Sequence, residues 1–195
     1  MPITTGVLLF DDAEELDFAG PWEVFTMART EGDRVVTIAE RAEPVRAAKG
    51  LRVIPDHGFD DAPTLDVLVV PGGEGTRTHA NVPSTLDWIK KVSADCTWVT
   101  SVCTGSLLLD AAGLVNGRNI TTHWAYIEQL RARGNATVLE DVRYVRDGNI
   151  VTAAGVSAGI DMALWLVGQL YGVPHARAVQ RFMEYDPAPP YAAEV

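Results

Sequence analysis

Short apolar runs rich in β-branched residues alternate with longer helix-like segments along most of this 195-residue chain. Such alternation favours a parallel sheet covered by helices on both faces. The expected strands are Thr5–Phe10, Arg34–Ala39, Leu65–Val70, Thr97–Val102, Asn119–Thr122, Val142–Arg146 and Ile150–Ala153. The expected helices are Pro21–Arg29, Ser84–Ala94, Thr104–Ala112, Trp124–Arg133, Ala158–Tyr171 and His175–Met183. The sequence therefore predicts an α/β fold with a mainly parallel sheet.

Three local signals refine this pattern. Pro21 suits the first turn of its helix, because proline there gives up no helical hydrogen bond. Ser84 and Asp87 match a capping box and are expected to open the next helix. The β-rich stretch Val45–Val53 is interrupted by Lys49-Gly50, which suggests a small hairpin or an edge excursion.

Length and composition place the whole chain, residues 1–195, in one expected domain. Asp186-Pro-Ala-Pro-Pro190 is expected to end regular structure. No apolar run approaches the length needed to span a bilayer, and the N-terminus lacks a basic region followed by an apolar stretch. We therefore expect a cytoplasmic protein that does not bind membranes.

Charge argues against nucleic acid as a partner. The chain has 16 Lys and Arg against 26 Asp and Glu, a formal net charge of −10, and no basic cluster. Binding to a phosphate backbone needs clustered positive charge. A small-molecule substrate is the expected partner.

The strand Thr97–Val102 ends at a cysteine followed by small residues. Ser101-x-Cys103-x-Gly105 has the spacing of a nucleophile elbow, a tight turn that lifts a nucleophile from a strand to the start of a helix. The N-terminus of that helix is expected to favour the thiolate of Cys103. The alternative is a buried cysteine that serves as a small core residue.

The second cysteine, Cys96, is expected to be a packed structural residue. In an extended strand it would lie roughly 23 Å from Cys103, at about 3.3 Å per residue, which is too far for a disulfide. Two free thiols agree with a reducing compartment.

Three strand tips are expected to converge, because ligands in open parallel sheets bind at the carboxyl ends of the strands. These tips are Asp11–Asp17, Gly72-Gly73 and Cys103. Asp17 alone in its acidic cluster has apolar neighbours, Leu16 and Phe18, so partial burial would raise the pKa of its carboxyl group. The alternative for Asp17 is an ordinary helix cap.

Several motifs together give the chain a family resemblance. They are Leu16-Asp17-Phe-Ala-Gly20-Pro21-x-Glu23-Val24-Phe25, Val70-Pro-Gly-Gly73, Cys103-Thr-Gly105, Ala112-Gly-Leu114 and Thr121-Thr-His-Trp124. The combination resembles the ThiJ/PfpI superfamily over almost the whole chain. Asp17 together with Cys103-Thr104 is most similar to the isonitrile hydratases of that superfamily, which add water to R–N≡C and release an N-substituted formamide.

The resemblance implies a flavodoxin-like three-layer sandwich and a homodimer, with no metal and no organic cofactor. It also implies that Cys103 is the nucleophile and Asp17 the acid and base, with Thr104 beside them. Backbone N–H groups near Gly72, Gly73 and Thr104 are expected to stabilise negative charge. Thr104 would orient Asp17 or a substrate group, or would only begin the helix.

Other functions in the superfamily stay open. A cysteine–histidine protease is disfavoured because those proteases have histidine at the position of Thr104, and His123 is expected to be structural or a dimer contact. A ligand sensor like those of AraC-type regulators would need a DNA-binding domain, for which we expect no room before Val195. A glyoxalase or deglycase would usually have glutamate in place of Asp17. A redox sensor would instead oxidise Cys103.

The remaining histidines and two tryptophans receive structural roles. His57, His79 and His175 lack metal-ligand spacing and are assigned to the surface or to packing. Trp22 and Trp124 would line a pocket or, more commonly for tryptophan, pack in the core or at an interface.

Overall fold

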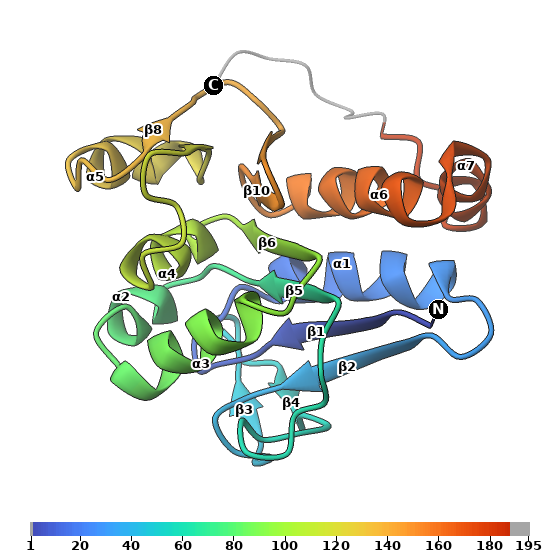
Figure 1. Cartoon of the computed structure of the whole chain (residues 1–195), viewed down its shortest axis with the longest axis horizontal. Helices are drawn as coiled ribbons and strands as arrows, with labels where there is room; N and C mark the ends of the chain where they lie inside the picture. Colours follow the sequence, from blue (N-terminus) through green and yellow to red (C-terminus); the bar gives the residue numbers. More distant parts are fainter. Residues whose placement is uncertain (1, 188–195) are drawn as a thin grey trace.

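A six-stranded sheet forms the centre of the molecule in the computed structural model, which describes residues 2–187. The strand order is β2-β1-β5-β6-β10-β9, and every neighbouring pair is parallel except β10 with β9. The strands are β1 (Thr4–Leu8), β2 (Arg34–Ile38), β5 (Val67–Val70), β6 (Trp98–Val102), β9 (Tyr144–Asp147) and β10 (Ile150–Ala153). The predicted mainly parallel sheet is confirmed (Figure 1).

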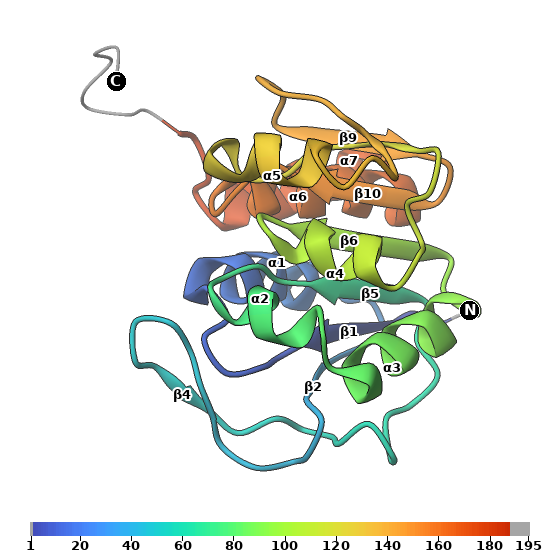
Figure 2. The ribbon, with the colours of Figure 1, turned by 90° about the vertical axis from the view of Figure 1, so that its left-hand side faces the viewer.

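Helices cover both faces of this sheet, as Figure 2 shows. One face carries α1 (Glu15–Ala28), α6 (Ala158–Tyr171) and α7 (Val173–Phe182), which contact one another. The opposite face carries α2 (Gly75–His79), α3 (Pro83–Ser93) and α4 (Gly105–Ala111). The three-layer α/β arrangement is therefore confirmed. No helix of the described residues is long and apolar enough to cross a membrane.

The core lies on both sides of the central strands. All four residues of β5 and all four of β10 are buried. Strands covered on both faces need apolar residues at every position, which explains the unbroken Leu and Val run of β5. The edge strand β9 is only partly buried, because helices do not enclose it in the same way.

Smaller elements complete the chain. The hairpin predicted over Val45–Val53 forms from β3 (Val45–Arg46) and β4 (Arg52–Val53), which pair antiparallel. β7 (Asn119–Ile120) is shorter than predicted and pairs with β8 (Thr137–Val138). The expected helix Trp124–Arg133 is instead a 3-10 turn, η1 (Trp124–Tyr126), followed by α5 (Ile127–Arg131). Both α2 and β8 are absent from the sequence prediction, since each is very short.

The prediction that Pro21 opens a helix is wrong. Helix α1 begins at Glu15 and contains Pro21 in its interior. Its early turns are fixed by tertiary packing: Phe18 is buried, and Gly20 lies so close to Ile160 of α6 that an added Cβ would be 2.9 Å from the Ile160 side chain. Asp17 is thereby placed in the first turn of a helix and not in a loop.

The capping box predicted at Ser84 is also absent. Helix α3 begins at Pro83, with proline in the first turn, and its N-cap residue Val82 makes no side-chain capping bond. The Ser84 hydroxyl donates to the Glu40 carboxylate at 2.8 Å instead. The predicted end of regular structure at Asp186–Pro190 lies partly outside the described residues.

Candidate active site

Cys103 occupies a tight turn between β6 and α4. Its backbone has φ = +56°, a left-handed conformation that residues other than glycine rarely adopt. The turn is held from two sides: the Cys103 N–H donates to the Ala153 carbonyl at 3.0 Å, and the Cys103 carbonyl accepts from the Thr122 hydroxyl at 3.0 Å. The strand-to-helix elbow expected from the Ser101-x-Cys103-x-Gly105 spacing is therefore present.

Asp17 is fully buried beside this turn. Its Oδ2 accepts the Gly72 N–H at 2.9 Å, while its Oδ1 has no hydrogen-bond partner among the described residues. A Cβ added at Gly72 would lie 2.8 Å from Asp17 Oδ2 and 2.8 Å from Cys103 Cβ. The three predicted strand tips therefore meet around Gly72, where only glycine fits.

Burial controls the ionisation of Asp17. Loss of hydration is the largest cause of a pKa raised from 3.8 to about 7, and the charge of Glu14 raises it further. The Gly72 N–H opposes this rise by donating to the carboxylate, and the neighbouring Cys103 thiol also lowers the pKa of Asp17. Near neutral pH, Asp17 can therefore both accept and donate a proton.

The expectation of a Cys103 thiolate is wrong for the free protein. Burial, followed by the negative charge of Asp17, raises the pKa of the Cys103 thiol to about 12. The Thr104 N–H and hydroxyl oppose this rise but do not overcome it. Because the thiol keeps its proton at neutral pH, its activation requires a base, and Asp17 is the adjacent one.

Thr104 anchors the loop that follows β5. Its Oγ1 accepts the Gly73 N–H at 3.0 Å and the Thr76 hydroxyl at 3.1 Å, and makes no hydrogen bond to Asp17. Gly73 itself has φ = +116°, and a Cβ there would clash with backbone atoms of Asp12 and Glu14. The N–H groups of Gly72 and Gly73 are thus both used within the protein.

A cavity of about 270 Å³ opens in front of Cys103. More than half of its lining residues are charged or polar, and the others are small or apolar. The lining residues are Glu14, Ala48, Lys49, Gly73, Glu74, Arg77, Cys103, Thr104, His123, Ala125, Tyr126 and Val156. The space suits a small molecule that presents one reactive atom to the sulfur.

His123 lies in the same cavity, but its ring is used locally. Its Nδ1 accepts the Ala125 N–H at 3.3 Å and so caps η1, and its ring packs against Gly155. Trp124 is 80% exposed and does not line the Cys103 cavity, and Trp22 packs against the core. These placements agree with structural roles for His123 and Trp22, whereas Trp124 is not packed in the core and lines a different cavity.

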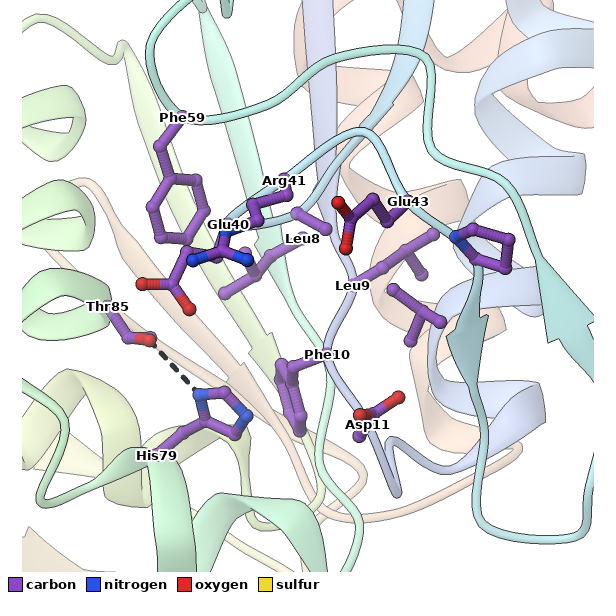
Figure 3. A pocket seen from close by; sticks show the side chains of 13 residues that line it. Leu8, Leu9, Phe10, Asp11, Glu40, Arg41, Glu43, Phe59, His79 and Thr85 are labelled. Atoms are coloured by element: carbon purple, nitrogen blue, oxygen red, sulfur yellow. Dashed lines mark hydrogen bonds between the residues drawn. The ribbon is translucent and has the colours of Figure 1, made fainter.

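A second cavity, of about 240 Å³, lies at the ends of β1 and β2 and contains none of the predicted site residues. Figure 3 shows His79 there, hydrogen-bonded to Thr85 at 3.0 Å and next to Phe10. Burial lowers the pKa of His79, so this ring is neutral at pH 7. No group of three or more His, Cys, Asp or Glu side chains within residues 2–187 could hold a metal ion.

Some site residues escaped sequence reasoning. Glu14 belongs to the acidic cluster before Asp17, where only Asp17 has apolar neighbours, and Lys49 lies in the predicted hairpin, which carries no chemical motif. Val156 lines the cavity with φ = +43°, a strained conformation for a β-branched residue. The sequence contains one signal that concerns these three residues, the Lys49-Gly50 turn, and it indicates a hairpin without indicating that the hairpin reaches the site.

The fold and the elbow cysteine define an α/β protein with a cysteine at a strand-to-helix turn, and comparison with known proteins shows its family. Residues 5–169 match the model of the DJ-1/PfpI family, and the chain belongs to that family. It is 44% identical over 191 residues to the isonitrile hydratase of Pseudomonas putida, covering 98% of this chain and 82% of that protein. A ThiJ/PfpI family protein from Pseudomonas syringae has a solved structure with a TM-score of 0.93 and 34% identity, covering 100% of this chain and 80% of the other.

A different kind of relative shares the same domain. The HTH-type transcriptional regulator GbdR of Pseudomonas aeruginosa is 28% identical over 95% of this chain, but the chain spans only 51% of that regulator. The chain is therefore similar to about half of a transcriptional regulator.

Proposed function

We propose that this protein is an isonitrile hydratase that converts R–N≡C and water into an N-substituted formamide. The observation that carries the proposal is the placement of a buried carboxyl group with a pKa near neutral, Asp17, beside the elbow of Cys103, since a Cβ at Gly72 would lie 2.8 Å from Asp17 Oδ2 and 2.8 Å from Cys103 Cβ. The 44% identity to the isonitrile hydratase of Pseudomonas putida supports the same activity. The reaction needs one nucleophile and one group that moves protons at neutral pH, and the two side chains supply both.

In the first half of the proposed reaction, the Cys103 sulfur attacks the terminal carbon of the isonitrile. Asp17 accepts the thiol proton as the carbon–sulfur bond forms and delivers it to the same carbon. The product is a thioimidate, R–N=CH–S, on Cys103. Because one proton passes from sulfur to carbon through Asp17, no net charge is created in the buried site.

In the second half, water adds to the thioimidate carbon while Asp17 acts as general base and the nitrogen gains a proton. The resulting adduct collapses as the carbon–sulfur bond breaks. Formamide leaves, and the sulfur regains its proton through Asp17. Every step uses water and groups of this chain.

The loop after β5 is proposed to support this chemistry indirectly. The Gly72 N–H donates to the Asp17 carboxylate, and the Gly73 N–H donates to the Thr104 hydroxyl oxygen, so both side chains are fixed by this loop. The Thr104 N–H, which faces the sulfur, is the donor best placed to stabilise negative charge on an intermediate. Thr104 is therefore proposed to act on the intermediate and not on Asp17.

The test is formamide production from one aliphatic and one aromatic isonitrile, measured beside methylglyoxal consumption and peptidase activity. We expect turnover of isonitriles alone. Cys103→Ala should lose at least about 1,000-fold in kcat, and Asp17→Asn about 100- to 10,000-fold, the usual contribution of a general acid–base.

The control variant is Asp87→Asn, which changes an exposed carboxyl group of α3 and should keep full activity. Normal formamide production by a folded Cys103→Ala variant would rule out the covalent route. If the wild-type protein does not hydrate isonitriles but consumes methylglyoxal, the protein is a glyoxalase and the proposed function is wrong.

We also propose that the protein is a cytoplasmic homodimer, as the family resemblance implies. A redox sensor is the less favoured function, because oxidation follows thiolate character and burial keeps the Cys103 thiol protonated.

A further inference from the structure

The hairpin β3–β4 is tied to the start of α1, and its tip reaches the active-site cavity. Ala48 N–H donates to the Ala13 carbonyl at 2.9 Å, and Lys49 N–H donates to the Glu15 carboxylate at 2.6 Å. Ala48 and Lys49 line the same cavity as Cys103. The hairpin therefore forms one wall of the site and does not simply lie on the sheet edge.

An ion pair joins this wall to the helix that carries Asp17. The Lys49 ammonium lies 2.5 Å from Glu14 Oε2, and Glu14 lines the cavity three positions before Asp17. The backbone fixes Glu14, because its N–H donates to the Gly72 carbonyl at 2.9 Å. Gly72 in turn donates to Asp17, so Glu14 and Asp17 share one support.

Such a pair contributes little to stability, since the Lys49 side chain is 68% exposed. Its charges still act across the cavity on the reacting groups. Negative charge on Glu14 disfavours the ionised forms of both Asp17 and Cys103. The ammonium of Lys49 counters it and is itself stabilised by Glu14, Glu15 and Asp17.

We propose that Lys49 and Glu14 are positioning residues whose ion pair sets the pH at which the Asp17–Cys103 pair becomes reactive. The predicted effect on catalysis rests on the proposed isonitrile hydratase function. The predicted effect on the titration of Asp17 does not, because it concerns the protein without substrate. Neither side chain exchanges a proton with substrate. Each acts through Asp17.

Other charged groups line the Cys103 cavity and also contribute to the electrostatic potential at Asp17. Glu74 and Arg77 of α2 line the cavity, His123 borders it before η1, and Cys103 lies beside Asp17. Arg77 donates to the Gly73 carbonyl at 2.8 Å and its guanidinium lies 4.8 Å from the centre of the Tyr126 ring. None of these groups belongs to the hairpin, so variants at Lys49 leave them in place.

The experiment is a carbon-13 NMR titration of the Asp17 carboxyl group, assigned by its loss in Asp17→Asn. Lys49→Met should move the midpoint to higher pH by about half a unit, because Glu14 is then uncompensated. Glu14→Gln should move it to lower pH by a similar amount, and the double variant should return towards wild type. Lys49→Arg should titrate like wild type.

The pH profile of kcat/KM should move with these midpoints. Its rising limb reports the form in which Asp17 and Cys103 share one proton. The matched control is Lys90→Met, which removes an exposed lysine from α3 and should change neither readout. Circular dichroism of each variant confirms folding.

Unchanged midpoints in folded Lys49→Met and Glu14→Gln variants, or shifts in the same direction, would overturn the inference even if isonitriles are hydrated. Opposite shifts in a protein without hydratase activity would uphold the charge coupling and refute the proposed function. The two failures are therefore distinguishable.

Discussion

Asp17 keeps a carboxyl group inside the protein, and one of its oxygens has no hydrogen-bond partner within residues 2–187. In the folded protein its pKa is about 7, against a value of 3.8 without the fold. The protonated form is therefore favoured by folding. Below pH 3.8 the carboxyl group is protonated in both states and its burial does not reduce stability through ionisation. As the pH rises from 3.8 to 7, the free energy of unfolding falls by about 4 kcal/mol, because the unfolded state releases the proton more easily.

Asp17→Asn should therefore raise the free energy of unfolding at pH 8 by about 2–4 kcal/mol, because the amide is neutral at every pH. The gain should fall below about 1 kcal/mol at pH 4, where the wild-type carboxyl group is protonated in the folded state and partly protonated in the unfolded state. Urea denaturation at pH 8 and pH 4 measures the difference. Asp87→Asn on the exposed surface should show no such pH dependence, and an equal gain at both pH values would contradict the prediction.

At this scale the sequence predicted the ionisation of Asp17 but not that of Cys103. Leu16 and Phe18 correctly suggested that Asp17 is buried with a raised pKa. The protonated Cys103 was missed, because the helix-start argument is local whereas burial arises from distant chain segments. Glu14 and Lys49 were missed for the same reason: their proximity depends on how a hairpin folds back on α1.

Helix α6 carries one long, strongly apolar pattern, and its bounds Ala158–Tyr171 agree with the prediction, as do those of β10. The start of α1 was missed because its early turns depend on contact with α6, far along the chain. Local patterns thus place elements that are apolar throughout. They fail where a long-range contact decides the boundary.

The contact of α6 with the elbow strand leads to a prediction about small residues. A Cβ at Gly159 would lie 3.0 Å and 3.1 Å from the two methyl groups of Val102, which is fully buried directly before Cys103. Gly159→Ala should therefore lower the free energy of unfolding by about 1–2 kcal/mol through overpacking. Urea denaturation measures the change.

Gly168→Ala on the same helix is the matched control. Its Cβ would be 3.7 Å from the Cβ of Ala176, an ordinary contact. This variant should gain about 0.5–1 kcal/mol from the better helix propensity of alanine. Equal effects of the two substitutions would show that the α6–β6 contact is not tightly packed.

On the scale of the whole molecule, the alternation of strands and helices was enough to predict the mainly parallel sheet and the meeting of three strand tips. The strand order and the antiparallel edge strand β9 were not predictable, because register and neighbours depend on how helices pack. The second cavity and the hairpin wall likewise arise from contacts between distant segments.

The proposed homodimer is a property of the same scale. Trp124 is 80% exposed and borders a cavity of about 610 Å³ with Ile127 and Val142. Exposed large apolar side chains are typical of association surfaces. Sedimentation should give twice the chain mass of 21.1 kDa at micromolar concentration. A mass that stays at one chain over the concentration range would refute the dimer.

The strained and uncompensated residues of the site also limit how the sequence can evolve. One oxygen of Asp17 has no partner in the part of the chain that the structure describes, while Cys103 and Val156 have left-handed backbone conformations. Neutral or more flexible residues at these positions would make the fold more stable, so drift under selection for stability alone would erase the site. A descendant freed from its reaction would keep the sheet and lose Asp17 early.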